Sequence, residues 1–247
     1  MPSPEAHLTN STRPAALCVL LTIVLAALSA HVDVARARDG GHSPQPTPST
    51  QAPAPPAPDR RAFWNKEFEE GKALLQKDAA PLLVAAVQGR TPGTALDLGM
   101  GEGRNALHLA AQGWTVTGVD LADVAVAQAL EKARARNLAL DGIVSDLDVY
   151  DLGTAQWDLI TSFYMHAWHR RSTTDVPARI LRALKPGGLL VIEGFADPPN
   201  RLGFVPATLA EVFGQLRILR NERVVDAAAW YVEEKTRLVR FVAEKPR

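Results

Sequence analysis

The residues best suited to chemistry in this sequence are an acid, a glycine-rich loop beside it and two further acids at intervals along the chain. Residues 94–98 are apolar except for Thr94 and Asp97, and glycine then occupies positions 99, 101 and 103. Because glycine has no Cβ atom, such a loop lets backbone N–H groups approach a ligand, and a helix that follows adds unpaired N–H donors. The stretch predicts a strand, a binding loop and a helix over residues 105–112.

The spacing of the glycines distinguishes between two kinds of nucleotide cofactor. A dinucleotide loop has the pattern G-x-G-x-x-G, which would place the third glycine at position 104. That position holds Arg104 and the third glycine is Gly103, so the pattern is D-x-G-x-G-x-G. An acid before the first glycine would repel a pyrophosphate, but it suits a ligand that presents an amino group. The alternative without a ligand is a glycine-rich turn that only connects a strand to a helix.

A second acid follows at the end of another predicted strand. Residues 114–120 are rich in strand-forming side chains and end at Asp120, which is 23 residues beyond Asp97. A carboxylate at the tip of a second parallel strand can accept hydrogen bonds from both hydroxyls of a ribose. Asp120 could also cap the helix predicted over residues 122–137, and the two roles are compatible. The pairing with Asp97 favours the ligand-binding interpretation.

A third acid lies near the end of a short run over residues 143–147. Asp146 is the member of this run that could accept a hydrogen bond from a ligand, although Asp148 and Asp151 are close enough to take its place. Each of these acids could instead be a solvated turn residue.

The glycine loop, read together with the order and spacing of the acids, resembles the first motif of class I S-adenosylmethionine-dependent methyltransferases. The string Leu-Lys-Pro-Gly-Gly at residues 184–188 resembles the post-adenine motif of that family, where its role is structural. The resemblance covers about residues 62–245 and implies S-adenosyl-L-methionine as the cofactor. It also implies an α/β fold, namely a doubly wound, Rossmann-like, seven-stranded mixed sheet with an antiparallel C-terminal edge strand and helices on both faces.

The resemblance implies which residues hold the cofactor. Residues 156–163 resemble the fourth strand of the family, whose end lies under the cofactor at the switch point of the sheet. Asp97 and Gly99 match the positions that bind the methionine part, whereas Asp146 would accept from the adenine amino group and the Leu147 amide would reach the ring. Trp64, in an aromatic helix predicted over residues 62–77, is a candidate lid residue, although this helix could simply pack on the sheet. The complete expected set is Trp64, Asp97, Gly99, Gly101, Asp120, Leu121, Asp146, Leu147 and Ser162.

Residues 164–171 occupy the place where the transferable methyl group would meet its acceptor. They include His166, whose imidazole could act as a base because it titrates near neutral pH. A hydrogen-bonded packing residue in an aromatic cluster is the alternative. The segment lacks the Asn-Pro-Pro-Tyr signature of many methyltransferases that modify nucleic-acid amino groups, so the expected partner is a small-molecule methyl acceptor. No three histidine or acid residues show the spacing of metal ligands, so no metal is expected.

The overall composition supports one sizeable domain without a strong charge. The chain has 247 residues, with 27 Lys and Arg against 27 Asp and Glu. This balance gives no global field that would attract or repel nucleic acid, so the charge gives no clear support for nucleic-acid binding and does not exclude it. The single cysteine, Cys18, excludes disulfides within the chain and cysteine-rich zinc sites.

The N-terminal region differs in composition from the rest of the chain. Residues 15–30 are uncharged and mostly apolar, a length between the core of a signal peptide and a membrane span. We expect residues 1–38 to be a signal peptide or a membrane anchor, residues 39–60 to be a disordered proline-rich linker, and residues 61–247 to be the methyltransferase domain. The cofactor is made in the cytoplasm, so a retained anchor would place the domain on the cytoplasmic face.

Two other functions remain open at this point. A non-catalytic module that binds S-adenosylmethionine, tethered at a membrane through residues 15–30, would keep the same acids. An oxidoreductase that uses a nicotinamide dinucleotide is disfavoured by the position of the third glycine. The acceptor and the oligomeric state do not follow from the sequence.

Overall fold

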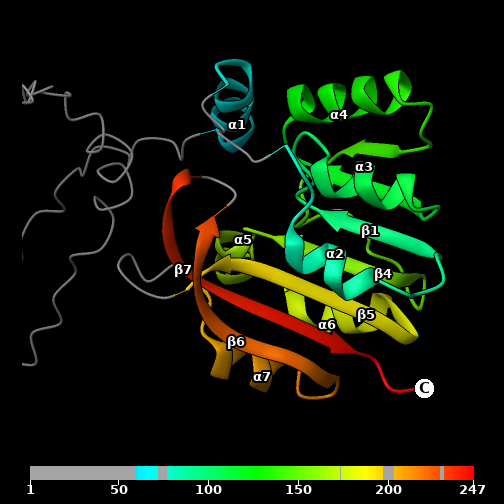
Figure 1. Ribbon diagram of the computed structural model, residues 1–247, viewed down its shortest axis with the longest axis vertical. Helices are drawn as coiled ribbons and strands as arrows, with labels where there is room; N and C mark the ends of the chain where they lie inside the picture. Colours follow the sequence, from blue (N-terminus) through cyan, green and yellow to red (C-terminus); the bar gives the residue numbers. More distant parts are fainter. Residues whose placement is uncertain (1–58, 72–76, 173, 197–202, 229–230) are drawn as a thin grey trace, which may run out of the picture. The chain divides into compact units, whose positions relative to one another are not determined.

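The computed structural model describes residues 59–71, 77–172, 174–196, 203–228 and 231–247 (Figure 1). The predicted signal or anchor lies outside the described residues, as does nearly all of the predicted linker, and both stay predictions. Among the helices that the structure describes, none is long and apolar enough to cross a bilayer.

Seven strands form one mixed sheet. They are β1 (Thr94–Leu98), β2 (Thr115–Asp120), β3 (Asp141–Val144), β4 (Trp157–Phe163), β5 (Leu184–Phe195), β6 (Arg217–Ala228) and β7 (Tyr231–Glu244). Their order across the sheet is β3-β2-β1-β4-β5-β7-β6, which Figure 1 shows from green at one edge to orange at the other. The five strands β1 to β5 are parallel, and β7 runs antiparallel to both β5 and β6. The predicted seven-stranded mixed sheet is confirmed. The C-terminal strand β7 lies between β5 and β6, so β6 is the edge strand.

Seven helices within the described residues connect or precede the strands. They are α1 (Arg60–Glu69), α2 (Pro81–Val87), α3 (Arg104–Ala111), α4 (Asp123–Ala135), α5 (His166–Arg171), α6 (Val176–Ala183) and α7 (Pro206–Val212). Six of them correspond to helices that the sequence predicts, over residues 62–77, 81–88, 105–112, 122–137, 174–184 and 207–213. The exception is α5, where polar and aromatic residues at 166–171 show no helical periodicity.

The apolar side chains form two layers, one on each face of the sheet. Successive residues of a strand point to opposite faces, so Leu96 and Leu98 join one cluster while Ala95 joins the other. The first cluster includes residues of α5, α6 and α7, and the second includes residues of α2, α3 and α4. Inner strands buried on both faces explain why β1, β4 and β5 are nearly unbroken apolar runs in the sequence.

The turn at residues 185–188 lies inside the pairing of β5 with β4. Leu184 pairs with Trp157 and Leu189 pairs with Leu159, so the four residues between are looped out of the register. Within this loop Gly187 has a φ of +79°, and a Cβ atom on Gly188 would lie 2.8 Å from the carbonyl oxygens of both Lys185 and Trp157. The string Leu-Lys-Pro-Gly-Gly, to which the resemblance gives a structural role, thus forms a loop that interrupts a strand.

We expect Gly188→Ala to destabilise the domain by about 3 kcal/mol, because the added methyl group meets two backbone atoms that cannot rotate away. Gly89→Ala is a matched control, since Gly89 has a φ of +73° but no atom within 4 Å of an added Cβ. Its cost is the left-handed conformation alone, about 1 kcal/mol. Urea denaturation of both variants measures the difference, and equal losses would contradict the packing described for Gly188.

Candidate active site

The glycine loop lies at the carboxyl end of β1 and is shaped by left-handed backbone. Gly99, Gly101 and Gly103 have φ values of +70°, +54° and +80°, which side chains other than glycine rarely adopt. Gly103 is the N-cap of α3 and provides no side-chain cap, so the first N–H groups of the helix face the loop. The predicted strand, loop and helix are confirmed at this position.

Asp97 is buried beneath this loop with only half of its carboxylate satisfied. Its side chain is 2% exposed, and its Oδ1 accepts a hydrogen bond of 2.6 Å from the Thr161 hydroxyl on β4. Its Oδ2 is buried without a partner among the described residues. Burial raises the pKa of Asp97 to about 6, although the hydrogen bond from Thr161 acts in the opposite direction. A cationic hydrogen-bond donor would satisfy this oxygen.

Asp120 ends β2 and connects two backbone segments. Its Oδ2 accepts from the Gly101 amide and its Oδ1 from the Ala122 amide, both at 2.9 Å. Burial raises the pKa of Asp120, while these amides act to lower it. The carboxylate therefore fixes the glycine loop against the start of α4, so the capping and loop-holding roles are both present. Each oxygen retains a lone pair that a ligand hydroxyl could use.

Asp146 and Leu147 lie beyond the end of β3, because this strand stops at Val144. Asp146 forms an ion pair with Arg60 of α1, and its Oδ1 also accepts from the Asp148 amide. The Leu147 side chain is buried in the cluster that contains Leu96, so only its backbone could meet a ligand. The structure therefore places Asp146 at the carboxyl edge of the sheet, with its carboxylate engaged by α1.

Helix α1 lies against the start of α4, next to Asp120. Asn65 donates to Asp123 at 2.7 Å and accepts from the Val124 amide, and Phe68 packs with Ala122 and Ala125. Trp64 is partly buried and packs against the same small cluster. The helix that sequence reasoning predicts as a lid is thus held over the ends of β2 and β3.

Ser162 and His166 lie on the other side of the sheet from Asp97. Ser162 is buried, and its hydroxyl lies 3.0 Å from Nε2 of His169 on α5. The ring of His166 packs edge-on against Phe195 and Phe204, and its Nδ1 is buried without a partner among the described residues. Burial lowers the pKa of His166 to about 4, so its imidazole is neutral at pH 7. The structure does not bring these two side chains together with Asp97 and Asp120.

A second polar cluster, which we call the Glu193 cluster, consists of Tyr164, Glu193, Asp226 and Arg240. Glu193 is 3% exposed, and its Oε2 accepts from Nε of Arg240 at 2.8 Å. The same guanidinium donates to Asp226 at 2.7 Å, and the Tyr164 hydroxyl donates to Glu193 at 3.3 Å. The backbone of Tyr164 has a φ of +60°, which is unusual for a residue with a bulky side chain. Backbone strain of this kind is concentrated at functional sites.

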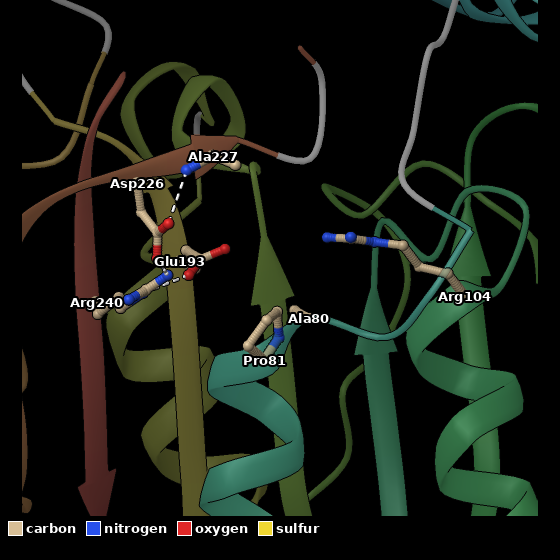
Figure 2. Close-up of a pocket in the computed structure, with 7 residues that line it drawn as sticks. All are labelled: Ala80, Pro81, Arg104, Glu193, Asp226, Ala227 and Arg240. Atoms are coloured by element: carbon tan, nitrogen blue, oxygen red, sulfur yellow. Dashed lines mark hydrogen bonds and ion pairs between the residues drawn. The ribbon is translucent and has the colours of Figure 1, made fainter. Parts of the chain in front are cut away.

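The Glu193 cluster forms one wall of a cavity of about 70 Å³, which Figure 2 shows from the side of α2. Arg104, at the start of α3, extends toward Glu193 from the opposite wall, and Ala80 and Pro81 lie between them. The cavity therefore joins the glycine loop to the antiparallel end of the sheet. Arg104, Asp226 and Arg240 are absent from the site that the sequence predicts.

One sequence signal could have identified Arg240. In β7 it lies in phase with Leu238 and Val242, on a face that packs against helices. An arginine in an apolar stripe needs carboxylate partners, because burying an unpaired charge is costly. Asp226 could not be found in this way, since it lies on an exposed part of the neighbouring strand.

In the described part of the chain, no cluster of histidine, cysteine or acid residues could hold a metal ion.

Comparisons with known proteins agree with this architecture. Residues 95–188 match the family model described as a methyltransferase domain. The chain is 32% identical over 135 residues to a ribosomal RNA small subunit methyltransferase C of Alcanivorax borkumensis, covering 52% of this chain and 38% of the relative. It is 32% identical over 122 residues to a malonyl-[acyl-carrier protein] O-methyltransferase of Enterobacter lignolyticus, covering 49% of this chain and 47% of the relative. The chain thus spans less than half of the length of either relative.

A solved structure has the same fold. It is a 1,6-didemethyltoxoflavin-N1-methyltransferase of Burkholderia thailandensis, with a TM-score of 0.61 at 21% identity over 76% of this chain and 87% of that one. The family model, the strand order and the glycine loop with its acids agree with one another. The chain therefore carries a methyltransferase domain of the class I S-adenosylmethionine-dependent family.

Proposed function

We propose that this protein transfers a methyl group from S-adenosylmethionine to a small-molecule acceptor. The observation that carries the proposal is the half-satisfied carboxylate of Asp97 beneath a loop of three left-handed glycines. A buried charge with an unpaired oxygen is costly unless a ligand completes its bonding. The ammonium group at the methionine end of the cofactor is a donor of the required charge.

The other parts of the cofactor have matching partners along the carboxyl edge of the sheet. We assign the ribose hydroxyls to Asp120 and the adenine edge to Asp146 and the Leu147 amide. The Gly99 and Gly101 backbone would contact the methionine chain, and Leu121 would lie beside the ribose. Helix α1, with Trp64, would cover the bound nucleoside. For Asp146 to bind the adenine, its ion pair with Arg60 must open or leave one oxygen available.

When bound, the cofactor supplies an activated methyl group on a sulfonium. Transfer to a neutral or anionic acceptor relieves a positive charge, so alignment and exclusion of water can account for most of the rate. This chain would contribute the alignment through the glycine loop and Asp97. The Glu193 cluster and Arg104 would form the wall that faces the acceptor.

The size and charge of the cavity support a small acceptor. Its volume is about 70 Å³, enough for a few heavy atoms beside the cofactor, and its walls carry two acids and two arginines. The solved structure from Burkholderia thailandensis, which shares this fold, contains bound 1,6-didemethyltoxoflavin and S-adenosylhomocysteine.

The decisive test combines binding and turnover. Calorimetry should show binding of S-adenosylhomocysteine and no binding of NADH. Incubation with S-adenosylmethionine and a panel of small nucleophiles should then produce S-adenosylhomocysteine together with a methylated product. Tight binding with no transfer to any acceptor would favour the non-catalytic module, and binding of NADH alone would favour the oxidoreductase.

We also propose that the domain acts on the cytoplasmic side, because its cofactor is made there. Protease accessibility in intact and lysed cells tests this placement. Cleavage of the domain in intact cells would contradict it.

Asp97 gives a prediction with a defined pH dependence. A pKa raised to about 6 means that the carboxylate is ionised at pH 8 and mostly protonated at pH 5. The affinity for S-adenosylhomocysteine should therefore fall as the pH drops through 6, by up to tenfold per unit. 5′-Methylthioadenosine, which lacks the amino acid end, should bind equally well at both pH values. Parallel affinity profiles for the two ligands would contradict the assignment.

Asp97→Asn should separate binding from stability. A raised carboxyl pKa means that ionised Asp97 lowers the stability of the free domain above pH 6, and this loss disappears as the pH falls toward 4. The variant should therefore unfold with a free energy higher by about 1–3 kcal/mol at pH 8, while its affinity for S-adenosylhomocysteine falls. A variant that is less stable at pH 8 would show that Asp97 stabilises the free fold.

Asp120→Ala should weaken binding of S-adenosylhomocysteine by about 1–3 kcal/mol, the cost of leaving buried polar partners unpaired. The Gly101 and Ala122 amides lose their acceptor in the same variant, so unfolding should be measured alongside binding. Asp120→Asn retains one acceptor oxygen and serves as the control. An unchanged dissociation constant for Asp120→Ala would remove the ribose assignment.

We propose that His166 is a packing residue of the aromatic cluster and not the catalytic base that the sequence suggests, because its ring packs against Phe195 and Phe204 on the face of the sheet opposite Asp97. With a pKa of about 4, its imidazole is neutral at pH 7 and is a weak proton acceptor. His166→Gln should therefore lower the stability of the domain and leave kcat nearly unchanged. A fall in kcat of about 10²-fold or more, the range of general base catalysis, would make His166 the base instead.

A further inference from the structure

Arg104 is a cation whose donors face the cavity without a matching acceptor. Its guanidinium has five N–H groups, and in the described part of the chain it forms one hydrogen bond, of 3.4 Å, to the carbonyl of Asp78. It forms no ion pair with any described carboxylate. Burial lowers the pKa of Arg104, and the electrostatic influence of Tyr164, Glu193 and Asp97 counteracts this only in part. Arg104 is therefore partly desolvated and lacks a close counter-charge.

Arg240, on the opposite wall, shows the contrasting arrangement. Its Nε donates to Glu193 and its Nη2 donates to Asp226, at 2.8 and 2.7 Å. These bonds occupy both acids of that wall and orient their charge toward Arg240. The cavity thus has one wall with satisfied charges and one wall, at Arg104, with spare donors directed inward (Figure 2).

We propose that Arg104 binds a carboxylate group inside this cavity, and this inference rests on the methyltransferase function proposed above. A guanidinium matches a carboxylate with two parallel N–H···O bonds, which makes it selective for a planar monoanion. The volume of about 70 Å³ admits such a group with few additional atoms. A doubly charged phosphate fits less well, because Glu193 and Asp226 are also at the cavity wall.

Two molecules could supply this carboxylate. One is the cofactor, whose methionine end carries a carboxylate next to the ammonium group assigned to Asp97. The other is the methyl acceptor, which would then belong to the class of small carboxylic acids. Arg104 follows the glycine loop directly and lies across from the Glu193 cluster, so it can reach either position.

The experiment compares three probes on wild-type protein and Arg104→Met. The first two are S-adenosylhomocysteine, which has a carboxylate, and 5′-methylthioadenosine, which does not; calorimetry measures both affinities. The third is sodium acetate, compared with sodium chloride at equal ionic strength, measured as a shift in melting temperature with and without S-adenosylhomocysteine. Arg220→Met is the control, since Arg220 is 41% exposed on β6 and pairs with Glu222.

A carboxylate from the cofactor predicts that Arg104→Met binds S-adenosylhomocysteine about 10- to 100-fold more weakly and 5′-methylthioadenosine unchanged. A carboxylate from the acceptor predicts that both adenosyl ligands bind normally, while acetate stabilises only the wild-type protein. Arg104→Lys should show a partial loss in either case, because it keeps the charge but not the planar pair of donors. It also serves as the folded variant if Arg104→Met proves unstable.

The proposal is overturned if both Arg104 variants bind all three probes as the wild-type protein does. It is also overturned if Arg220→Met shows the same losses, because the effect would then be one of general charge. A wild-type protein that binds neither adenosyl ligand would refute the proposed function instead. Acetate on the free protein would still test the carboxylate site in that case.

Discussion

The site depends on one costly feature, a carboxylate buried under the end of the first strand of the sheet. Asp97 is 2% exposed, and only one of its oxygens has a partner among the described residues. The free fold accepts this cost, which appears as a pKa of about 6, because both faces of the sheet are packed with apolar side chains. The two apolar clusters stabilise the domain enough to tolerate Asp97, whose carboxylate destabilises the free fold and is suited to a ligand.

The local parts of this arrangement could be predicted from the sequence. Alternation of the glycines fixes the loop, since only glycine adopts left-handed backbone at three alternate positions without strain. Asp97 and Asp120 each end a run of strand-forming residues, so their position at one edge of a parallel sheet follows from the pattern alone. The order of helices and strands could be predicted in the same way, and α5 was missed because its six residues have no apolar periodicity.

The parts that could not be predicted depend on contacts between distant segments. The ion pair of Arg60 with Asp146 spans 86 residues, and that of Arg240 with Glu193 spans 47. No local pattern reports which carboxylate such an arginine will meet. The direction of a strand side chain was equally hard to predict. Ser162 and Thr161 are neighbours in β4, but Ser162 faces His169 while Thr161 faces Asp97. A shift of one residue decides which of them can reach the cofactor side.

The hairpin of β6 and β7 contributes Asp226 and Arg240 to the cavity wall, whereas the glycine loop and its acids come from the first half of the domain. Under the function proposed here, part of the acceptor wall is therefore encoded separately from the residues that would hold the cofactor. Mutations in the hairpin could then alter which molecule is modified while the glycine loop and its acids stay intact. Such a division favours divergence toward new acceptors, since an ancestral protein could sample them while it continued to hold the same methyl donor.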